Sequence, residues 1–477
     1  MATLVEYDEE DVDHLLNAGE SEFGRVHYER LMQDIKNDVV SSLTLTVHGR
    51  SARRAYGSGH VKWALVLPSQ AAVDLLLPPI CAALAGASAL LEFHAQATHL
   101  SDEAVASIVS TLGGGGCGGL CALTLAQNFA GQEASDALAA LLGADRLRAL
   151  ALPRNRLGDE GTIALLRGVR AGTPLRHLDL SSCQIGEHAV MRLADVMDDV
   201  DCVEHLNLSG NSLDSPASVE ALASMISRST SLRFLSLAAS QLSDASGAKL
   251  FQTCSGSVRL EHLDLWGNAF GPAAANAIAN VLTVNRSIRT LVLSRNRIDD
   301  EGAAALGAAL VANTTLVELE LDANEIGTAG LERLCVVLCT DTVRKRLVMS
   351  GNAAGVEGMA LLANMLSTNK SLQVLEVARV EETTHIREEL RGDVRDESHR
   401  SSLTGVDGGA FGRSTLADRM RARHMRTTIS EPRKGRTESG VPTKKGSTGS
   451  GGDDNRGDGD GDGNGDGDGD GDGDGDG

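Results

Sequence analysis

One recurring motif constrains the fold of this chain more than any other feature of its sequence. Segment 260–270, LEHLDLWGNAF, has Leu at its first, fourth and sixth positions, Asn at its ninth and an aromatic residue at its eleventh. Segments of the same form begin at Leu147, Leu175, Val203, Leu232, Leu260, Ile288 and Leu316, with intervals of 28, 28, 29, 28, 28 and 28 residues. A constant period of this length predicts a solenoid, in which each unit packs only on its neighbours.

Each repeat combines a short strand with a helix. The fourth and sixth positions, such as Leu263 and Leu265, point to one side of the strand, because strand side chains alternate, and they are expected to form the core. Residues 299–315 then place Ala and Leu at helical spacing. The ninth position is most often Asn, which can bond backbone groups left unpaired at the bend; Cys183 takes this place once, in a structural role.

The strand, the bend and the helix together indicate a family. Segments 297–327, RIDDEGAAALGAALVANTTLVELELDANEIG, and 157–180, LGDEGTIALLRGVRAGTPLRHLDL, resemble the ribonuclease-inhibitor-like subtype of leucine-rich repeat. NOD-like receptor repeat domains and Ran GTPase-activating proteins share this subtype. The resemblance covers 120–377 strongly and 41–119 weakly. It implies an α/β horseshoe with a concave parallel sheet and convex helices, and it carries little information about function.

The flanks of the regular repeats have other patterns. Residues 1–40 predict a helical N-terminal cap over the first open repeat. Residues 41–119 form degenerate repeats, with strands at 43–47 and 63–67, a return helix at 75–84 and a flexible glycine loop at 113–116. The regular repeats occupy 120–377, although the unit near Arg344 has lost its first Leu. Residues 378–477, a basic linker and a Gly-Asp tail, are predicted to be disordered.

The charge of the chain bears on its partners, and its cysteine usage bears on its location. The net charge is −21, of which −10 comes from eleven Asp and one Arg beyond residue 450. A mildly acidic body argues against a general nucleic-acid or membrane-surface binder. The eight Cys lack a framework spacing, and neither a secretory signal nor a long apolar run is present. The expected location is cytoplasmic, with a nuclear or perinuclear location as the alternative.

The concave face holds the candidate binding residues. The third and fifth positions of successive repeats should form two exposed stripes, with strands ~4.8 Å apart. Trp266, at the seventh position, stands where the other repeats have small residues and is a candidate anchor; the alternative is a ring lying flat on its neighbours. The full set of candidate residues is His177, Asp179, His205, Asn207, Phe234, His262, Asp264, Trp266, Arg295, Glu318 and Glu320.

No catalytic, cofactor or metal site is predicted. Nothing places a nucleophile, a base and an orienting group together, and the His177/His205 pair lacks further ligands at a fixed spacing. The sequence therefore predicts a non-enzymatic scaffold that binds a protein partner. The alternative is a GTPase activator for a Ran-like small GTPase, because that family also joins such repeats to an acidic tail.

Overall fold

The computed structural model describes residues 22–46, 53–57, 60–66, 70–253, 259–353 and 355–377. All of them belong to one compact unit, Met1–Ile429. The predictions for residues 1–21 and for the basic linker and Gly-Asp tail at 378–477 lie outside the described residues. Within the described ranges, fourteen strands form one sheet, and twelve helices alternate with them.

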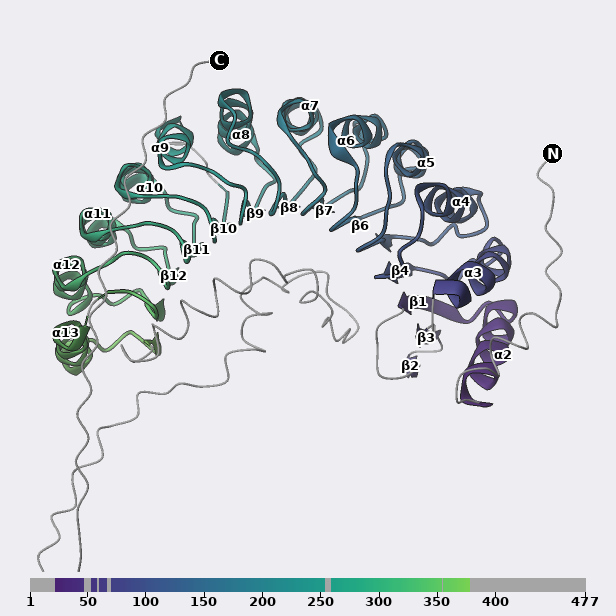
Figure 1. Cartoon of the computed structure of the whole chain (residues 1–477), viewed down its shortest axis with the longest axis horizontal. Coiled ribbons are helices and arrows are strands. Elements are labelled where there is room, and N and C mark those ends of the chain that lie inside the picture. Colours follow the sequence, from purple (N-terminus) through teal and green to yellow (C-terminus); the bar gives the residue numbers. More distant parts are fainter. Residues whose placement is uncertain are drawn as a thin grey trace, which may run out of the picture. The chain divides into compact units, whose positions relative to one another are not determined.

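The strands line the inner side of the stacked repeats (Figure 1). They are β1 (Val40–Thr46), β2 (Arg53–Gly57), β3 (His60–Val66), β4 (Glu92–Gln96), β5 (Ala122–Thr124), β6 (Ala149–Ala151), β7 (His177–Asp179), β8 (His205–Asn207), β9 (Phe234–Ser236), β10 (His262–Asp264), β11 (Thr290–Val292), β12 (Glu318–Glu320), β13 (Arg346–Val348) and β14 (Val374–Glu376).

The helices line the outer, convex side (Figure 1). They are α2 (Glu22–Lys36), α3 (Gln70–Leu84), α4 (Asp102–Gly113), α5 (Gln132–Leu142), α6 (Gly158–Leu166), α7 (Glu187–Val200), α8 (Pro216–Arg228), α9 (Asp244–Thr253), α10 (Pro272–Val284), α11 (Asp300–Ala312), α12 (Thr328–Leu338) and α13 (Gly355–Thr368).

The core runs between sheet and helices as one continuous ladder of aliphatic side chains. Parallel pairing places Leu263 of β10 beside Leu235 of β9 and Leu291 of β11. Leu263 and Leu265 are 2% and 0% exposed, as their repeat positions predicted. Burial of one such side chain stabilises the fold by about 1.5–3 kcal/mol, and the period repeats this contribution in each unit.

The first strands do not stack in chain order, contrary to the prediction of successive degenerate repeats. The sheet order at this end is β4-β1-β3-β2, so β1 pairs with β4 and β3 lies outside β1. β2 pairs antiparallel with β3 and forms the edge of the sheet. Trp63 of β3 donates a 2.9 Å hydrogen bond from Nε1 to the buried Asp34 carboxylate, which ties α2 to this hairpin.

The glycine run at 113–116 ends α4 and enters the connection to β5, so it lies between two units as predicted, but it packs closely on a neighbouring backbone segment. Gly113 ends α4, and Gly115 adopts a φ of 97°. A Cβ on Gly116 would lie 1.3 Å from the carbonyl oxygen of Ala85, so the absence of a side chain allows two backbone segments to touch.

Asn side chains at the ninth repeat position join adjacent repeats. Asn268 Nδ2 donates to the carbonyl oxygens of Leu237 and Leu265 at 2.9 and 3.1 Å. Its Oδ1 accepts from the backbone N–H groups of Ser240 and Leu242. Cys183 takes the same place and directs its Sγ to the Leu152 carbonyl at 3.0 Å, which agrees with a structural role.

Several helix N-termini are capped by an Asp of the preceding repeat. Asp102 Oδ1 accepts from the backbone N–H groups of Gly131 and Ala134, at 2.7 and 2.9 Å, where α5 begins. Gly131 has no side chain to do this itself. Equivalent bonds are made by Asp159 to Gly186, Asp214 to Ser243, Asp244 to Gly271 and Asp300 to Gly327.

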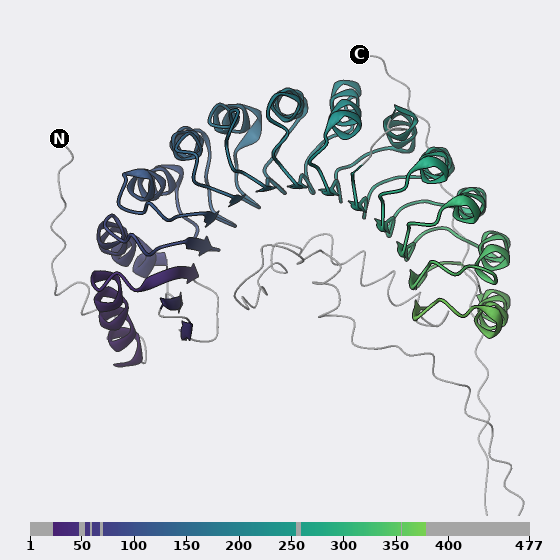
Figure 2. The same cartoon turned by 180° about the vertical axis from the view of Figure 1, so that it is seen from behind.

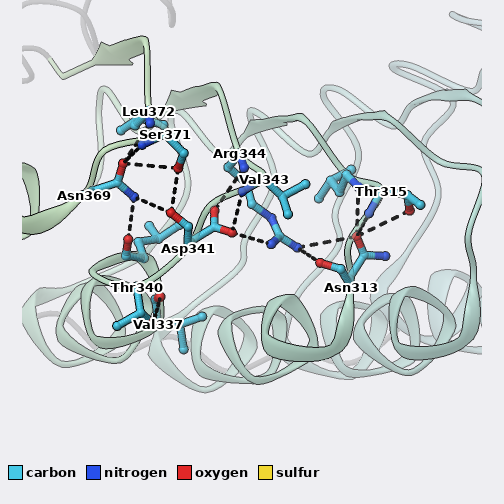
Figure 3. A network of polar contacts seen from close by, with 12 residues as sticks. Asn313, Thr315, Val337, Thr340, Asp341, Val343, Arg344, Asn369, Ser371 and Leu372 are labelled. Carbon is cyan, nitrogen blue, oxygen red and sulfur yellow. Dashed lines mark hydrogen bonds and ion pairs between the residues drawn. The ribbon is translucent and has the colours of Figure 1, made fainter.

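Two residues that compensate for each other, Asp341 and Arg344, account for the repeat that has lost its first Leu (Figure 3). Asn313 and Asn369 fill the turn between helix and strand, and Asp341 takes the corresponding place between them. Unlike Asn, Asp341 has no side-chain amide N–H to donate. The Arg344 guanidinium, which is 2% exposed, donates to the Asn313 carbonyl at 2.7 Å and to Asp341 Oδ1 at 2.8 Å. Arg344, which stands where the other repeats have their first Leu, therefore supplies the hydrogen-bond donors that the Asp341 side chain lacks.

Candidate binding face

The concave face is formed by in-register strands, so residues at one repeat position stand side by side. His177, His205, Phe234, His262, Thr290 and Glu318 form the first stripe, and Asp179, Asn207, Ser236, Asp264, Val292 and Glu320 form the second. Figures 1 and 2 show that none of the described helices covers this side of the sheet. The two predicted stripes therefore exist as neighbouring rows of side chains.

Four rings of the first stripe stack into a row, which we call the ring row: His177, His205, Phe234 and His262. Ring centroids of successive members are 4.4, 5.7 and 4.6 Å apart, and the interplanar angles are 18°, 19° and 10°. Each ring is half-buried. Burial, together with the charge of Arg233, lowers the pKa of His205, which favours a neutral imidazole in this row.

The second stripe is less exposed than predicted. Ser236, Asp264, Val292 and Glu320 are all buried, whereas Asp179 and Asn207 are half-buried. Asp264 stands between the larger side chains of His262 and Trp266, which point to the same side of the chain two residues away. Burial beside these rings removes the Asp264 carboxylate from water.

The Asp264 carboxylate has only neutral donors among the contacts described. Its Oδ1 accepts from the backbone N–H of Trp266 at 3.1 Å, and its Oδ2 accepts from Ser236 Oγ at 3.1 Å. Burial raises the pKa of Asp264 to about 6, although both hydrogen bonds act in the opposite direction.

Glu320 lies in a charged group at the C-terminal end of the face. Arg346 donates from Nε to Glu320 Oε1 at 3.3 Å, and its other arm contacts Glu376 at 2.6 Å. Burial raises the pKa of Glu320 to about 7 despite the nearby guanidinium. Arg346 and Glu376 continue the two stripes but were missed from the sequence. Arg346 follows Glu318 by one repeat length of 28 residues, so the repeat period could have identified it.

Trp266 packs against an arginine of the next repeat. The Arg295 guanidinium carbon lies 4.8 Å from the centroid of the Trp266 ring, a cation–π contact. Trp266 is half-buried, and its Nε1 has no hydrogen-bond partner in the described ranges. At the next strand, Ser294 Oγ donates to Asp322, so the seventh position also forms a row.

The described residues contain no group of three or more His, Cys, Asp or Glu side chains that could hold a metal ion. His177 and His205 stack face to face, which makes them members of the ring row. Burial raises the pKa of the Cys81, Cys183 and Cys335 thiols to about 12, as expected for packed thiols. No helix in the described part of the chain has the length and apolar character needed to cross a membrane.

Comparison with known proteins agrees with the repeat architecture. A leucine-rich repeat family matches residues 173–194, 284–307 and 312–335. Mouse capping protein, Arp2/3 and myosin-I linker protein 2 is 33% identical over 144 residues, which is 29% of this chain and 11% of that protein. Bovine Tonsoku-like protein is 33% identical over 230 residues, which is 46% of this chain and 16% of that protein. The chain thus matches only a small part of these relatives.

Two solved structures are similar at lower levels. An internalin from Listeria monocytogenes is 15% identical with a TM-score of 0.40, covering 77% of this chain and 97% of that one. Leiomodin-1 actin-binding site 2 is 20% identical with a TM-score of 0.21, covering 26% of this chain and 78% of that one. The ribonuclease-inhibitor-like subtype stays a prediction. The repeat motif, its stacked strand–helix units and the family match together make this chain a leucine-rich repeat protein.

Proposed function

We propose that this protein is a non-enzymatic scaffold that binds a protein partner on its concave face, at strands β7 to β12. The observation that supports this most strongly is the ring row, flanked by buried carboxylates, on a side of the sheet that no described helix covers. A cytoplasmic location belongs to the same proposal.

The chemistry of this face suits a protein surface. Half-buried rings offer apolar area that is already ordered, so a partner side chain packed on them would lose little additional entropy from this side. Burial raises the pKa of the Asp264 carboxyl to about 6 and that of the Glu320 carboxyl to about 7. A cationic group from a partner would satisfy them, which gives the face a preference for Arg or Lys side chains.

The relatives suggest which partners to try first. The name of the mouse relative contains capping protein, Arp2/3 and myosin-I. Capping protein, Arp2/3 and myosin-I are therefore suitable first baits, and the matched part is 11% of that relative.

Capture of partners by face variants tests the proposal. We expect Trp266→Ala and His205→Glu to weaken capture of a bait at least tenfold, because each removes a ring or places a charge on the stacked rings. Matched controls on the convex side are Val311→Ala and Met191→Glu, at residues that are 72% and 46% exposed. Equal capture by the face variants and their controls would contradict concave binding.

The GTPase-activator alternative needs a separate experiment. Neither of the two relatives reported above has a name that refers to GTPase activation. A single-turnover GTP hydrolysis assay with Ran distinguishes the two functions: stimulation by this protein would overturn the pure scaffold.

A further inference from the structure

The concave face carries more negative than positive side chains between β7 and β13. At the third, fifth, seventh and eighth repeat positions, its strands carry five carboxylates and two guanidinium groups, and two of the carboxylates, those of Asp264 and Glu320, are buried. The charged residues are Asp179, Asp264, Glu318, Glu320 and Asp322, and Arg295 and Arg346.

The same chain contains a segment of complementary charge. Residues 413–426, RSTLADRMRARHMR, hold five Arg and a single Asp. Three of these Arg are spaced two residues apart, at 419, 421 and 423. In an extended conformation they would point to one side, with Arg419 and Arg423 about 13 Å apart. Asp179 and Asp264 are three strands apart on the sheet, or about 14 Å.

The rings of the face also suit this segment. An Arg guanidinium stacks on aromatic and imidazole rings as well as pairing with carboxylates. The fold already makes this contact twice, with Arg295 over Trp266 at 4.8 Å and Arg156 over Phe129 at 4.5 Å.

The connection is long enough. The described chain ends at Val377, and residues 378–412 provide a 35-residue connection to the basic segment. A chain of this length spans up to ~120 Å when extended. Strand β7 lies seven strand spacings from β14, or about 34 Å. The tether therefore reaches every strand of the ring row.

We propose that residues 413–426 bind the concave face of their own chain, between β7 and β12, and compete there with a protein partner. The proposal rests on the proposed function, because it concerns the same face and makes its occupancy self-regulated. A tethered segment acts at an effective concentration in the mM range, so even a weak contact would occupy the face for most of the time.

A labelled peptide with the sequence of residues 413–426 tests the competition in trans, by fluorescence anisotropy with the full-length chain. The full-length variant Arg419→Glu/Arg421→Glu/Arg423→Glu should bind this peptide about tenfold more tightly than wild type, because its own segment no longer competes. The matched control is Arg433→Glu/Lys434→Glu/Arg436→Glu, with the same change of charge, and it should bind as wild type does. Equal affinity for wild type and both variants would overturn the proposal.

The site of binding needs its own test. Adding Asp264→Asn/Glu320→Gln to the segment variant should weaken peptide binding at least tenfold, with an unchanged circular dichroism spectrum confirming the fold. A photoreactive residue at Met420 of the otherwise wild-type chain should crosslink to peptides of β7 to β12, whereas one at Leu403 should not. Crosslinks to the convex helices, or equal binding of a scrambled peptide, would overturn the proposal.

Partner capture separates the two proposals. If the segment variant captures baits more strongly than wild type, both are supported. If the peptide competes as expected but the Trp266→Ala variant captures every bait normally, partner binding on this face fails, and the binding of residues 413–426 to the face stands.

Discussion

At the scale of single residues, Arg344 shows how a repeat tolerates a buried charge. Replacing it alone by Leu leaves Asp341 buried without its guanidinium partner, which typically costs about 3–5 kcal/mol. The double variant Asp341→Asn/Arg344→Leu restores the pair of residue types found in the neighbouring repeats. We expect its free energy of unfolding in urea to lie within about 1 kcal/mol of wild type. Additive losses in this double-mutant cycle would contradict the compensation.

Asp264 makes a pH-dependent contribution to the free energy of unfolding, and its raised pKa gives the sign. Its pKa is about 6 in the folded chain, against about 3.9 when unfolded. Between these values the folded state binds more protons, so stability is lost as the pH rises from about 4 to about 6.

The Asp264→Asn variant keeps the acceptor for the Trp266 N–H and removes this titration. It should be equal to wild type near pH 4 and more stable at pH 7 by on the order of 3 kcal/mol. Urea unfolding at both pH values measures the difference. If the free energies of unfolding of the two proteins differ by the same amount at both pH values, the titration of Asp264 is not the cause of the difference.

At the scale of elements, two adjacent Asp residues cap two different helices. Asp299 caps its own helix α11 by accepting from Glu301 and Gly302. Asp300 caps α12 of the next repeat by accepting from Gly327 and Gly330. Each Asp→Ala change should cost about 1 kcal/mol.

Hydrogen exchange separates the two caps. Asp300→Ala should accelerate exchange at Gly327 and Gly330, and Asp299→Ala at Glu301 and Gly302. Faster exchange confined to α11 in both variants would show that capping across the repeat boundary contributes nothing.

The glycine run provides a second prediction for an element. Gly116→Ala places a methyl group onto the Ala85 backbone and should destabilise the early repeats by at least about 2 kcal/mol. Gly118→Ala is the matched control, because its Cβ would meet nothing within 4 Å. Thermal unfolding should distinguish the two, and equal melting temperatures would contradict the close backbone contact.

At the scale of the whole molecule, the period predicted the solenoid because the same few side chains build every unit. It also placed His177, Asp179 and their counterparts in two rows. It did not predict that Asp264 and Glu320 are buried, because burial depends on flanking side chains such as Trp266 that differ between repeats. It also missed the hairpin at the first edge, where β2 pairs antiparallel with β3 and the repeat rule does not apply.

The Asp caps give the stack of repeats a polarity. Asp102, Asp159, Asp214, Asp244 and Asp300 each complete a helix start that lies later in the chain. A cut made just before such a helix removes the cap from the downstream fragment and leaves the helix caps of the upstream fragment in place. Shortening the solenoid from its C-terminal end is therefore less damaging than shortening it from its N-terminal end, and engineered junctions belong before helices such as α8 and α11, which are capped by their own Ser215 and Asp299.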